Sequence, residues 1–167
     1  MIKTGDQHLD QLRDGRVIYI GDEKVDDVTK HPAFERAAKT VAKLYDIKHQ
    51  KIYKDSLTYE ENGETFSTWF LQAKNRDDLR KRSKAHKIIA DQTCGMMGRS
   101  MDHVASFVTG MSTSPDIFDS GKYKFKNNLL NYYNFIKKND TFASYAVVPP
   151  QAARNPEFYQ KENLPIP

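Results

Sequence analysis

The chain has 167 residues, a formal net charge of +4 and a hydrophobic fraction of 38%, which is enough for one domain with a core but hardly for two. Its 9 phenylalanines, 9 tyrosines and single tryptophan offer large areas for burial, so we expect a core built on aromatic rings. The lone cysteine, Cys94, excludes an intramolecular disulfide framework and, with no apolar run as long as a membrane span or a signal peptide, predicts a cytoplasmic protein.

The first elements expected are a helix and a hairpin. Residues 4–14 have the pattern of a short helix, which Thr4 caps and Gly15 ends. Residues 16–25 alternate on either side of a Gly-Asp-Glu turn, which is typical of a small β-hairpin.

A longer helix and a second hairpin follow. Apolar residues recur at helical spacing over residues 31–49, where a His-Pro pair opens the expected helix. Residues 57–71 indicate an irregular hairpin, because Asn62-Gly63 favours a type I′ turn. Trp69 and the neighbouring phenylalanines are expected to anchor this hairpin to the helices.

Three helices are predicted in the second half of the chain. Asn75 caps the first, with Asp78 at the capping-box position, Ser100 starts the second, and the third covers residues 122–138. The expected inner stripe of the first is Leu79, Ala85, Ile88, Ile89 and Thr93. The residues expected to face inward on the other two are Val104, Phe107, Val108, Phe125, Leu129, Tyr132, Tyr133 and Ile136. A short strand over residues 144–151 and a tail without periodicity complete the chain.

The junction between the first two of these helices is the most informative segment. Gly95 and Gly98 are expected to end one helix, and Ser100 to cap the next, which leaves Arg99 between them. An aspartate and a histidine follow in the first turn. A guanidinium beside a helix N-terminus is suited to an anionic or phenolic oxygen. The alternative is an inter-helix corner with a solvated arginine.

Other kinds of site find little support. The histidines form no pair at metal-ligand spacing, no Gly-rich phosphate loop follows a strand, and no serine lies in a nucleophile elbow, so no metal site is predicted. Cys94, beside Met96 and Met97, is interpreted as a small buried thiol. Basic clusters at 80–87 and 122–126 raise the question of nucleic-acid binding, but acidic residues nearby favour solvated helix faces.

Three segments, in order, resemble the oxygenase components of the 4-hydroxyphenylacetate 3-monooxygenase family. The first segment is LDQLRDGRVIYIGDEKVDDVTKHPAF. The second, GMMGRSMDHVASFVTG, is similar to the family's Gly-Arg-Ser/Thr-Pro-Asp-Tyr segment. The third, YAVVPPQAARN, is similar to its His-Ala-x-x-x-Pro-Gln-x-Asp-Arg flavin loop. The resemblance covers nearly the whole chain and implies reduced FAD, delivered by a separate flavin reductase.

The resemblance also implies roles for individual residues. Arg99 would bind the substrate phenol and stabilise phenolate character, with His103 and Tyr145 as the other catalytic positions. Substrate contacts are implied at Arg99, Ser100, Met101, Asp102, His103 and Tyr145. Flavin contacts are implied at Tyr145, Ala146, Val147, Gln151, Ala152, Ala153 and Arg154.

Four positions depart from the family pattern. His103 stands where the phenol-hydroxylating members carry Tyr, and Tyr145 stands where they carry His. Met101 replaces the usual Pro, and Ala153 replaces Asp. The exchange of His and Tyr can preserve a hydrogen-bonded pair with swapped roles, or indicate a different substrate or lost activity, because histidine can act as a general base near neutral pH.

The expected fold is mainly α with short β-hairpins: the N-terminal helical domain of the acyl-CoA-dehydrogenase-like flavin hydroxylases, residues 1–140, and the first strand of a truncated flavin-binding middle β-domain, residues 141–167. The expected function is that of the N-terminal part of a two-component oxygenase, inactive alone, that hydroxylates a phenol such as 4-hydroxyphenylacetate with O2. At full length we expect a homo-oligomer, with no membrane and no nucleic-acid partner.

Two alternatives stay open. One is a truncated helical binding module without catalytic activity, which would bind a protein or nucleic acid through its Lys-rich faces. The other is a relative of 4-hydroxybutyryl-CoA dehydratase. Those enzymes need an iron–sulfur cluster held by several cysteines, and this chain offers only Cys94.

Overall fold

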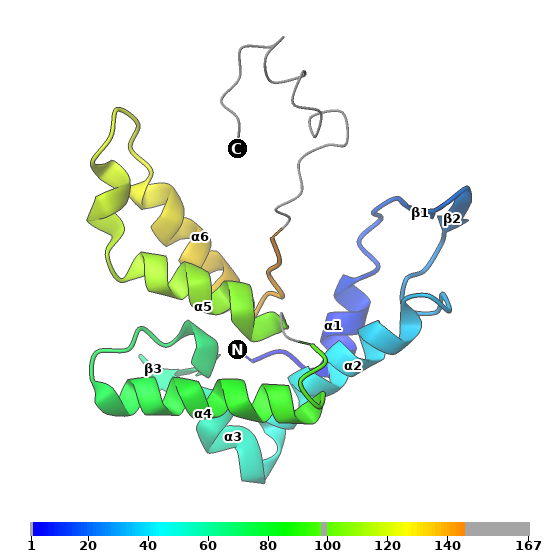
Figure 1. Ribbon diagram of the computed structural model, residues 1–167, viewed down its shortest axis with the longest axis horizontal. Coiled ribbons are helices and arrows are strands. Elements are labelled where there is room, and N and C mark those ends of the chain that lie inside the picture. The colour runs from blue at the N-terminus through cyan, green and yellow to red at the C-terminus, as the bar shows by residue number, and fades with distance from the viewer. Residues whose placement is uncertain (1, 98–99, 146–167) are drawn as a thin grey trace.

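The structure is a computed structural model that describes residues 2–97 and 100–145, and it is mainly helical (Figure 1). The α-helices are α1 (Gly5–Gln11), α2 (Glu35–Asp46), α3 (Lys51–Leu57), α4 (Arg76–Gln92), α5 (Met101–Ser112) and α6 (Lys126–Lys138). The 3₁₀ helices are η1 (Ile47–His49), η2 (Thr68–Phe70) and η3 (Pro115–Asp119). The two antiparallel hairpins are β1 (Ile18–Ile20) with β2 (Glu23–Val25), and β3 (Thr58–Glu61) with β4 (Glu64–Ser67). The predicted class, helices with short hairpins, is confirmed.

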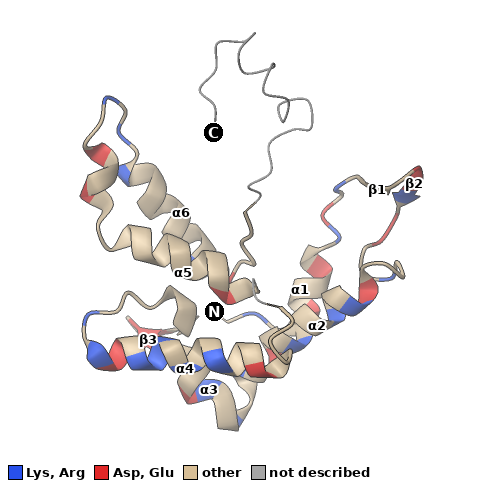
Figure 2. Cartoon of the chain, in the orientation of Figure 1, with Lys and Arg blue, Asp and Glu red and all other residues tan. Residues whose placement is uncertain are grey.

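The helices form pairs around a shared core (Figure 1). α1 packs along α2, and the β1–β2 hairpin extends beyond this pair, away from α5 and α6. α4 lies against α3 and η2, and α5 lies beside α6. Charged residues are frequent along α4, whereas the only Asp, Glu, Lys or Arg on α5 is Asp102 (Figure 2).

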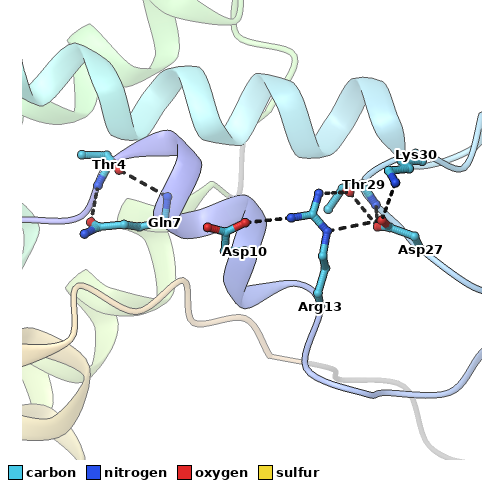
Figure 3. Close-up of polar contacts among 7 residues, drawn as sticks. All are labelled: Thr4, Gln7, Asp10, Arg13, Asp27, Thr29 and Lys30. Atoms are coloured by element: carbon cyan, nitrogen blue, oxygen red, sulfur yellow. Dashed lines mark hydrogen bonds and ion pairs between the residues drawn. The ribbon is translucent and has the colours of Figure 1, made fainter.

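Local capping signals define the first helix and its connection to the next (Figure 3). The backbone N–H of Gln7 donates to Thr4 Oγ1 (3.2 Å), and that of Thr4 donates to Gln7 Oε1 (2.9 Å), which completes a capping box. Beyond the helix, Arg13 donates to Asp27 Oδ2 (3.3 Å) and to Thr29 Oγ1 (2.9 Å). The predicted Thr4 cap is therefore confirmed, and Arg13 holds the end of α1 against the turn before α2.

The second hairpin closes through the predicted Asn-Gly turn. Asn62 (φ 53°) and Gly63 (φ 78°) both have positive φ, as a type I′ turn requires. The strands pair so that Thr58 lies opposite Ser67. η2 follows directly after the last residue of β4, and its Trp69 is buried (1% exposed).

The core is built on rings, as the composition predicted. Trp69, Tyr45 and Phe70 are its most deeply buried aromatic members, and each is at most 1% exposed. Aliphatic residues from four helices surround them: Val41, Leu44, Ala85, Ile89, Met101, Val104, Val108 and Ile136. The core therefore joins α2, α4, α5 and α6 through η2.

A buried ion pair lies within this core. Asp140, just after α6, pairs with the fully buried Lys48, which also lies over the ring of Tyr45. Asp140 Oδ1 accepts from Ser67 Oγ (2.7 Å), and Oδ2 accepts from the backbone N–H of Lys3 (2.9 Å). The Tyr45 hydroxyl donates to the Asp140 carbonyl (3.0 Å). We call Lys3, Tyr45, Lys48, Ser67 and Asp140 the Asp140 cluster; it fixes the end of α6 and hence the path toward residue 145.

Some helix boundaries differ from the expected ones. α2 begins at Glu35 because the residues from His31 onward form a turn first. α3 was not expected, since Leu57 is its only buried residue and it has no apolar stripe. α6 begins at Lys126, whose backbone N–H donates to Asp119 Oδ1 (3.0 Å), because residues 120–125 form an irregular bend between η3 and the helix.

The cap of α4 is partly as predicted. Asn75 Oδ1 accepts from the backbone N–H groups of Asp77 and Asp78 (both 2.9 Å), so the cap is confirmed. Asp78 does not complete a capping box with Asn75. Its carboxylate accepts instead from the backbone N–H of Lys74 (2.8 Å).

Several residues expected to be inward or buried are exposed, and those predictions are wrong. They are Leu79 (59% exposed), Phe107 (60%), Phe125 (51%), Tyr132 (48%) and the thiol-bearing Cys94. Helical spacing shows that a helix has an apolar face, but it does not show whether another element covers that face. Ile89 and Ile136, on the same stripes, are buried.

Two further findings bear on the sequence predictions. Among the described residues, no helix combines the length and the apolar character that crossing a bilayer requires. Residues 141–145 have no regular secondary structure, and the rest of the expected strand lies outside the described residues. The boundary between 1–140 and 141–167 therefore stays a prediction.

Candidate active site

The junction between α4 and α5 begins with a left-handed turn. Cys94 (φ 51°) and Gly95 (φ 73°) leave the helical conformation, and the backbone N–H of Gly95 donates to the carbonyl of Ala90 (2.9 Å). Glycine tolerates this conformation without strain, which explains why α4 ends here. Gly98 and Arg99, which the sequence analysis placed at the centre of the site, lie outside the described residues.

Asp102 connects the beginning of α5 to α4. Ser100 is the extended N-cap residue of α5, but its hydroxyl donates to Asp102 Oδ1 (2.5 Å) instead of capping a backbone N–H. His86, from α4, makes a 2.6 Å hydrogen bond from Nδ1 to Asp102 Oδ2. On the other side of the imidazole, Nε2 lies 3.2 Å from Ser106 Oγ. We call His86, Ser100, Asp102 and Ser106 the Asp102 cluster.

The protonation of this cluster follows from its contacts. Burial raises the pKa of Asp102, but hydrogen bonds from His86 and Ser100 together lower it more, so the net pKa lies below the ordinary carboxyl value. Asp102 is therefore ionised at neutral pH. Because an ionised carboxylate only accepts, the proton of this hydrogen bond lies on Nδ1 of His86, while Nε2 faces the Ser106 hydroxyl.

His103 and Tyr145 meet although they are far apart in the chain. His103 Nε2 lies 3.4 Å from the Tyr145 hydroxyl, and the two ring centroids are 5.7 Å apart with planes tilted by 35°. His103 stands in the first turn of α5, while Tyr145 follows the segment that Asp140 fixes. Tyr145 is 44% exposed, so part of its surface is accessible to a bound molecule.

A cavity of about 390 Å³ lies at this junction. Its lining includes His86, Asp102, His103, Ser106, Ile89 and Met97. The polar residues come from both helices, while Ile89 and Met97 give the cavity an apolar wall. This combination of an apolar wall and a few convergent polar groups is typical of a small-molecule site.

The predicted site residues fall into three groups. His103 and Tyr145 lie together, and Asp102 lies beside His103 with its carboxylate turned to His86. Ser100 (2% exposed) and Met101 (0%) are buried, and the Met101 side chain belongs to the core. The other predicted residues lie outside the described residues: Arg99, Ala146, Val147, Gln151, Ala152, Ala153 and Arg154.

Two residues of the site were missed by the sequence analysis. His86 and Ser106 both line the cavity and hydrogen-bond to each other. The one available signal was the position of His86, directly after the buried Ala85 on the inner stripe of α4. That position shows that the ring is near the core, but a partner on another helix leaves no spacing pattern.

The arrangement limits the possible chemistry. An imidazole and a phenol in contact can hold a substrate hydroxyl and move a proton. The Ser106–His86–Asp102 contacts resemble a hydrolytic triad, yet Ser106 lies inside α5, where backbone N–H groups bond within the helix and cannot form an oxyanion hole. Among the described residues, no three His, Cys, Asp or Glu side chains are grouped so as to hold a metal ion.

Comparison with known proteins finds one family whose model matches most of the sequence. The family described as "4-hydroxyphenylacetate 3-hydroxylase N terminal" matches residues 4–166. The oxygenase component of 4-hydroxyphenylacetate 3-monooxygenase from Thermus thermophilus is 37% identical over 170 residues, covering 99% of this chain and 34% of the relative. A 2,4,6-trichlorophenol monooxygenase from Cupriavidus pinatubonensis is 32% identical, covering 96% and 33%. The chain thus spans about a third of the length of the relatives it matches.

Solved structures agree with the sequence comparison. The oxygenase component of 4-hydroxyphenylacetate 3-monooxygenase complexed with FAD and 4-hydroxyphenylacetate superimposes with a TM-score of 0.83 at 37% identity, over 89% of this chain and 31% of that chain. An archaeal 4-hydroxybutyryl-CoA dehydratase superimposes with a TM-score of 0.68 at 18% identity, over 85% and 28%. The second likeness shows a shared fold alone.

Proposed function

The chain belongs to the 4-hydroxyphenylacetate 3-hydroxylase N-terminal family, and on that premise we propose that it is the N-terminal part of a two-component monooxygenase oxygenase. The enzyme would hydroxylate a phenol ortho to its hydroxyl group, using O2 and reduced FAD from a separate flavin reductase. The observation that carries the proposal is the contact of Tyr145 with His103, which lines the α4–α5 cavity. It gives a phenolic hydroxyl two groups that can hydrogen-bond to it.

The substrate site is proposed to hold the phenol between α5 and residue 145. Arg99 would stabilise negative charge on the phenolic oxygen, as a fixed guanidinium can. His103 would accept or hold the phenolic proton, and Tyr145 would orient His103 through their hydrogen bond. Ser100, Met101 and Asp102 would support the site, since the first two are buried and Asp102 bonds to His86.

The flavin is proposed to lie against the segment from Tyr145 onward. Tyr145 fits such a role because it is 44% exposed and contacts His103, which lines the cavity. Ala146, Val147, Ala152 and Ala153 would offer backbone, Gln151 an amide, and Arg154 a positive charge, which is a suitable donor set for an anionic cofactor. When bound, reduced FAD supplies two electrons, so that one atom of O2 enters the ring and the other leaves as water.

The substrate class is proposed to be phenols. Relatives are named for 4-hydroxyphenylacetate, 4-nitrophenol and 2,4,6-trichlorophenol, which share only the phenolic hydroxyl and the ring. This chain carries His103 where the family pattern has Tyr, and Tyr145 where it has His, and the two side chains lie within hydrogen-bond distance of each other. We therefore propose a phenol whose hydroxyl is recognised by this pair and whose ring substituents the cavity wall selects.

The wider setting follows from the same family. We propose that residues 1–140 form the helical domain and 141–167 begin the flavin-binding β-domain. Because the chain spans about a third of its relatives, the remaining walls of the flavin site would come from further chain in a cytoplasmic homo-oligomer. A mass measurement of the natural gene product from the source cells tests this, with about three times the present length expected.

The activity is tested with ¹⁸O2. The natural gene product containing this chain is supplied with FAD, NADH, a flavin reductase and 4-hydroxyphenylacetate. We expect a product heavier by one ¹⁸O atom, identified by mass spectrometry. Binding of reduced FAD without incorporation of oxygen into any phenol tested would contradict the proposal and favour a binding module without catalytic activity.

Arg99 provides the sharper test of the site. In the same protein, Arg99→Ala should lower hydroxylation by about 10²–10³-fold, because a preorganised positive charge is lost, while reduced-FAD binding stays largely intact. The matched control is Arg80→Ala, which removes an exposed guanidinium on α4 that pairs with Asp77, three residues earlier on the same helix. Normal hydroxylation by the Arg99 variant would show that its assignment is wrong.

A further inference from the structure

We propose that His86, a residue of α4 outside the substrate contacts proposed above, is a positioning residue for the phenol site. By donating a hydrogen bond to Asp102, it would hold the first turn of α5, and with it His103, in the orientation that meets Tyr145. The inference rests on the proposed function for its catalytic consequence. Its structural part, that His86 orders this turn, stands separately.

The first argument is the way the two oxygens of Asp102 are used. Oδ1 accepts from Ser100, which lies in the same turn and cannot attach α5 to anything else. Oδ2 accepts from His86, which belongs to a different helix. The imidazole is therefore what ties the carboxylate of Asp102 to α4, through a short hydrogen bond of 2.6 Å to a charged acceptor.

The second argument is the place of Asp102 in the chain. Ser100, which hydrogen-bonds to Asp102, directly follows Arg99 in the sequence, and His103 directly follows Asp102. Anchoring Asp102 therefore restrains the turn from Ser100 to His103, which carries the proposed phenol-binding imidazole. A shift of about 1 Å in such groups can change a rate about 10²-fold, so loss of this anchor is expected to lower the rate of hydroxylation.

The third argument separates positioning from direct catalysis. His86 has both ring nitrogens engaged, Nδ1 by Asp102 and Nε2 by Ser106. A substrate would have to displace Ser106 to hydrogen-bond to Nε2. His103, in contrast, has its Nε2 directed at Tyr145 and lies in the same cavity lining. His103 is thus placed to touch a phenol, while His86 acts through Asp102.

The test compares two substitutions at one position. His86→Asn keeps a side-chain N–H near the place of Nδ1, whereas His86→Leu has a similar size without a donor. In the natural gene product, with 4-hydroxyphenylacetate as the probe, we expect His86→Leu to lower kcat about 10²-fold. His86→Asn should recover at least about tenfold of that loss, with KM changed less than kcat in both. Lys87→Leu, an exposed neighbour on α4, is the control and should match the unmodified protein.

Two outcomes would overturn the inference. One is an unchanged kcat in His86→Leu. The other is a His86→Asn variant as impaired as His86→Leu while both unfold at the same temperature as the unmodified protein, since restoring the donor would then restore nothing.

A second measurement keeps the inference separate from the proposed function. In the 167-residue chain, NMR order parameters of the Ser100 and His103 amides should fall in His86→Leu and recover in His86→Asn. If the unmodified gene product hydroxylates no phenol, the proposed function has failed, and these order parameters alone decide the structural part. Equal values in all three proteins would overturn it.

Discussion

Asp140 and Asp102 are the centres of two hydrogen-bonded clusters. In each, an aspartate accepts from a serine and from a side-chain nitrogen, but the two clusters differ in their access to solvent. The Asp140 side chain is 2% exposed and pairs with a lysine that is fully buried, and serine and backbone donors occupy its remaining capacity. The Asp102 side chain is 13% exposed and pairs with an imidazole that is 36% exposed beside a cavity. The first cluster is closed to solvent and the second is open on one side.

The difference indicates how a polar cluster can serve stability or function. Among the described residues, no buried side-chain nitrogen or oxygen lacks a hydrogen-bond partner, so neither cluster stores an unsatisfied group. In the Asp140 cluster, removal of one partner leaves the other partner's charge buried, unpaired and inaccessible to water. In the Asp102 cluster, water or a ligand can replace a lost partner. We therefore expect changes at Asp140 to affect mainly the free energy of unfolding, and changes at Asp102 to affect mainly catalysis.

The largest effect is expected at Lys48. Lys48→Met keeps the bulk of the side chain but leaves the Asp140 carboxylate buried without its cation, which should lower the free energy of unfolding by about 3–5 kcal/mol. Urea unfolding followed by circular dichroism measures the loss. The matched control is Lys43→Met, an exposed lysine of α2, which should change stability by no more than about 0.5 kcal/mol. Equal losses in the two variants would contradict the closed character of the cluster.

The next effect is a pH dependence carried by His8. His8 stacks on Tyr45 with centroids 4.9 Å apart, and burial, followed by the charges of Lys3 and Lys48, lowers its pKa to about 4 from the usual 6.5. Above pH 6.5 the ring is neutral in the folded and unfolded states. Between pH 6.5 and about 4 the unfolded chain binds a proton that the folded chain does not, so the free energy of unfolding falls as the pH falls.

His8→Phe isolates this contribution because an aromatic ring can still stack on Tyr45 while the titrating imidazole is lost. Urea midpoints of both proteins, measured at pH 7 and pH 4.5, should show a smaller decrease in the variant. An identical decrease in both proteins would mean that other groups cause the pH dependence and that the Asp140 cluster does not hold His8 neutral.

The two clusters also show which parts of the structure can be predicted from the sequence. The Thr4 cap and the Asn62-Gly63 turn depend on residues a few positions apart, so they could be predicted. Lys48 and Asp140 are 92 residues apart, and nothing near either one distinguishes it from a surface charge. The same applies to His86, whose partner lies on another helix. Proximity of His103 and Tyr145 was suggested only by family resemblance, since no spacing rule joins positions 42 residues apart.

The smallest effects come from a matched pair of serines, and they test the comparison most directly. Ser67 donates to Asp140 Oδ1 and accepts from Lys48 Nζ (3.1 Å), so Ser67→Ala removes a partner from two buried charges and should cost about 1.5–3 kcal/mol. Ser106 bonds to the partly exposed imidazole of His86, where water can take its place, so Ser106→Ala should cost about 0.5–1 kcal/mol. Urea unfolding of the two variants compares them under identical conditions. If the losses are equal, access to water does not separate the clusters, and the difference between a structural and a functional carboxylate must lie in the charge of its partner instead.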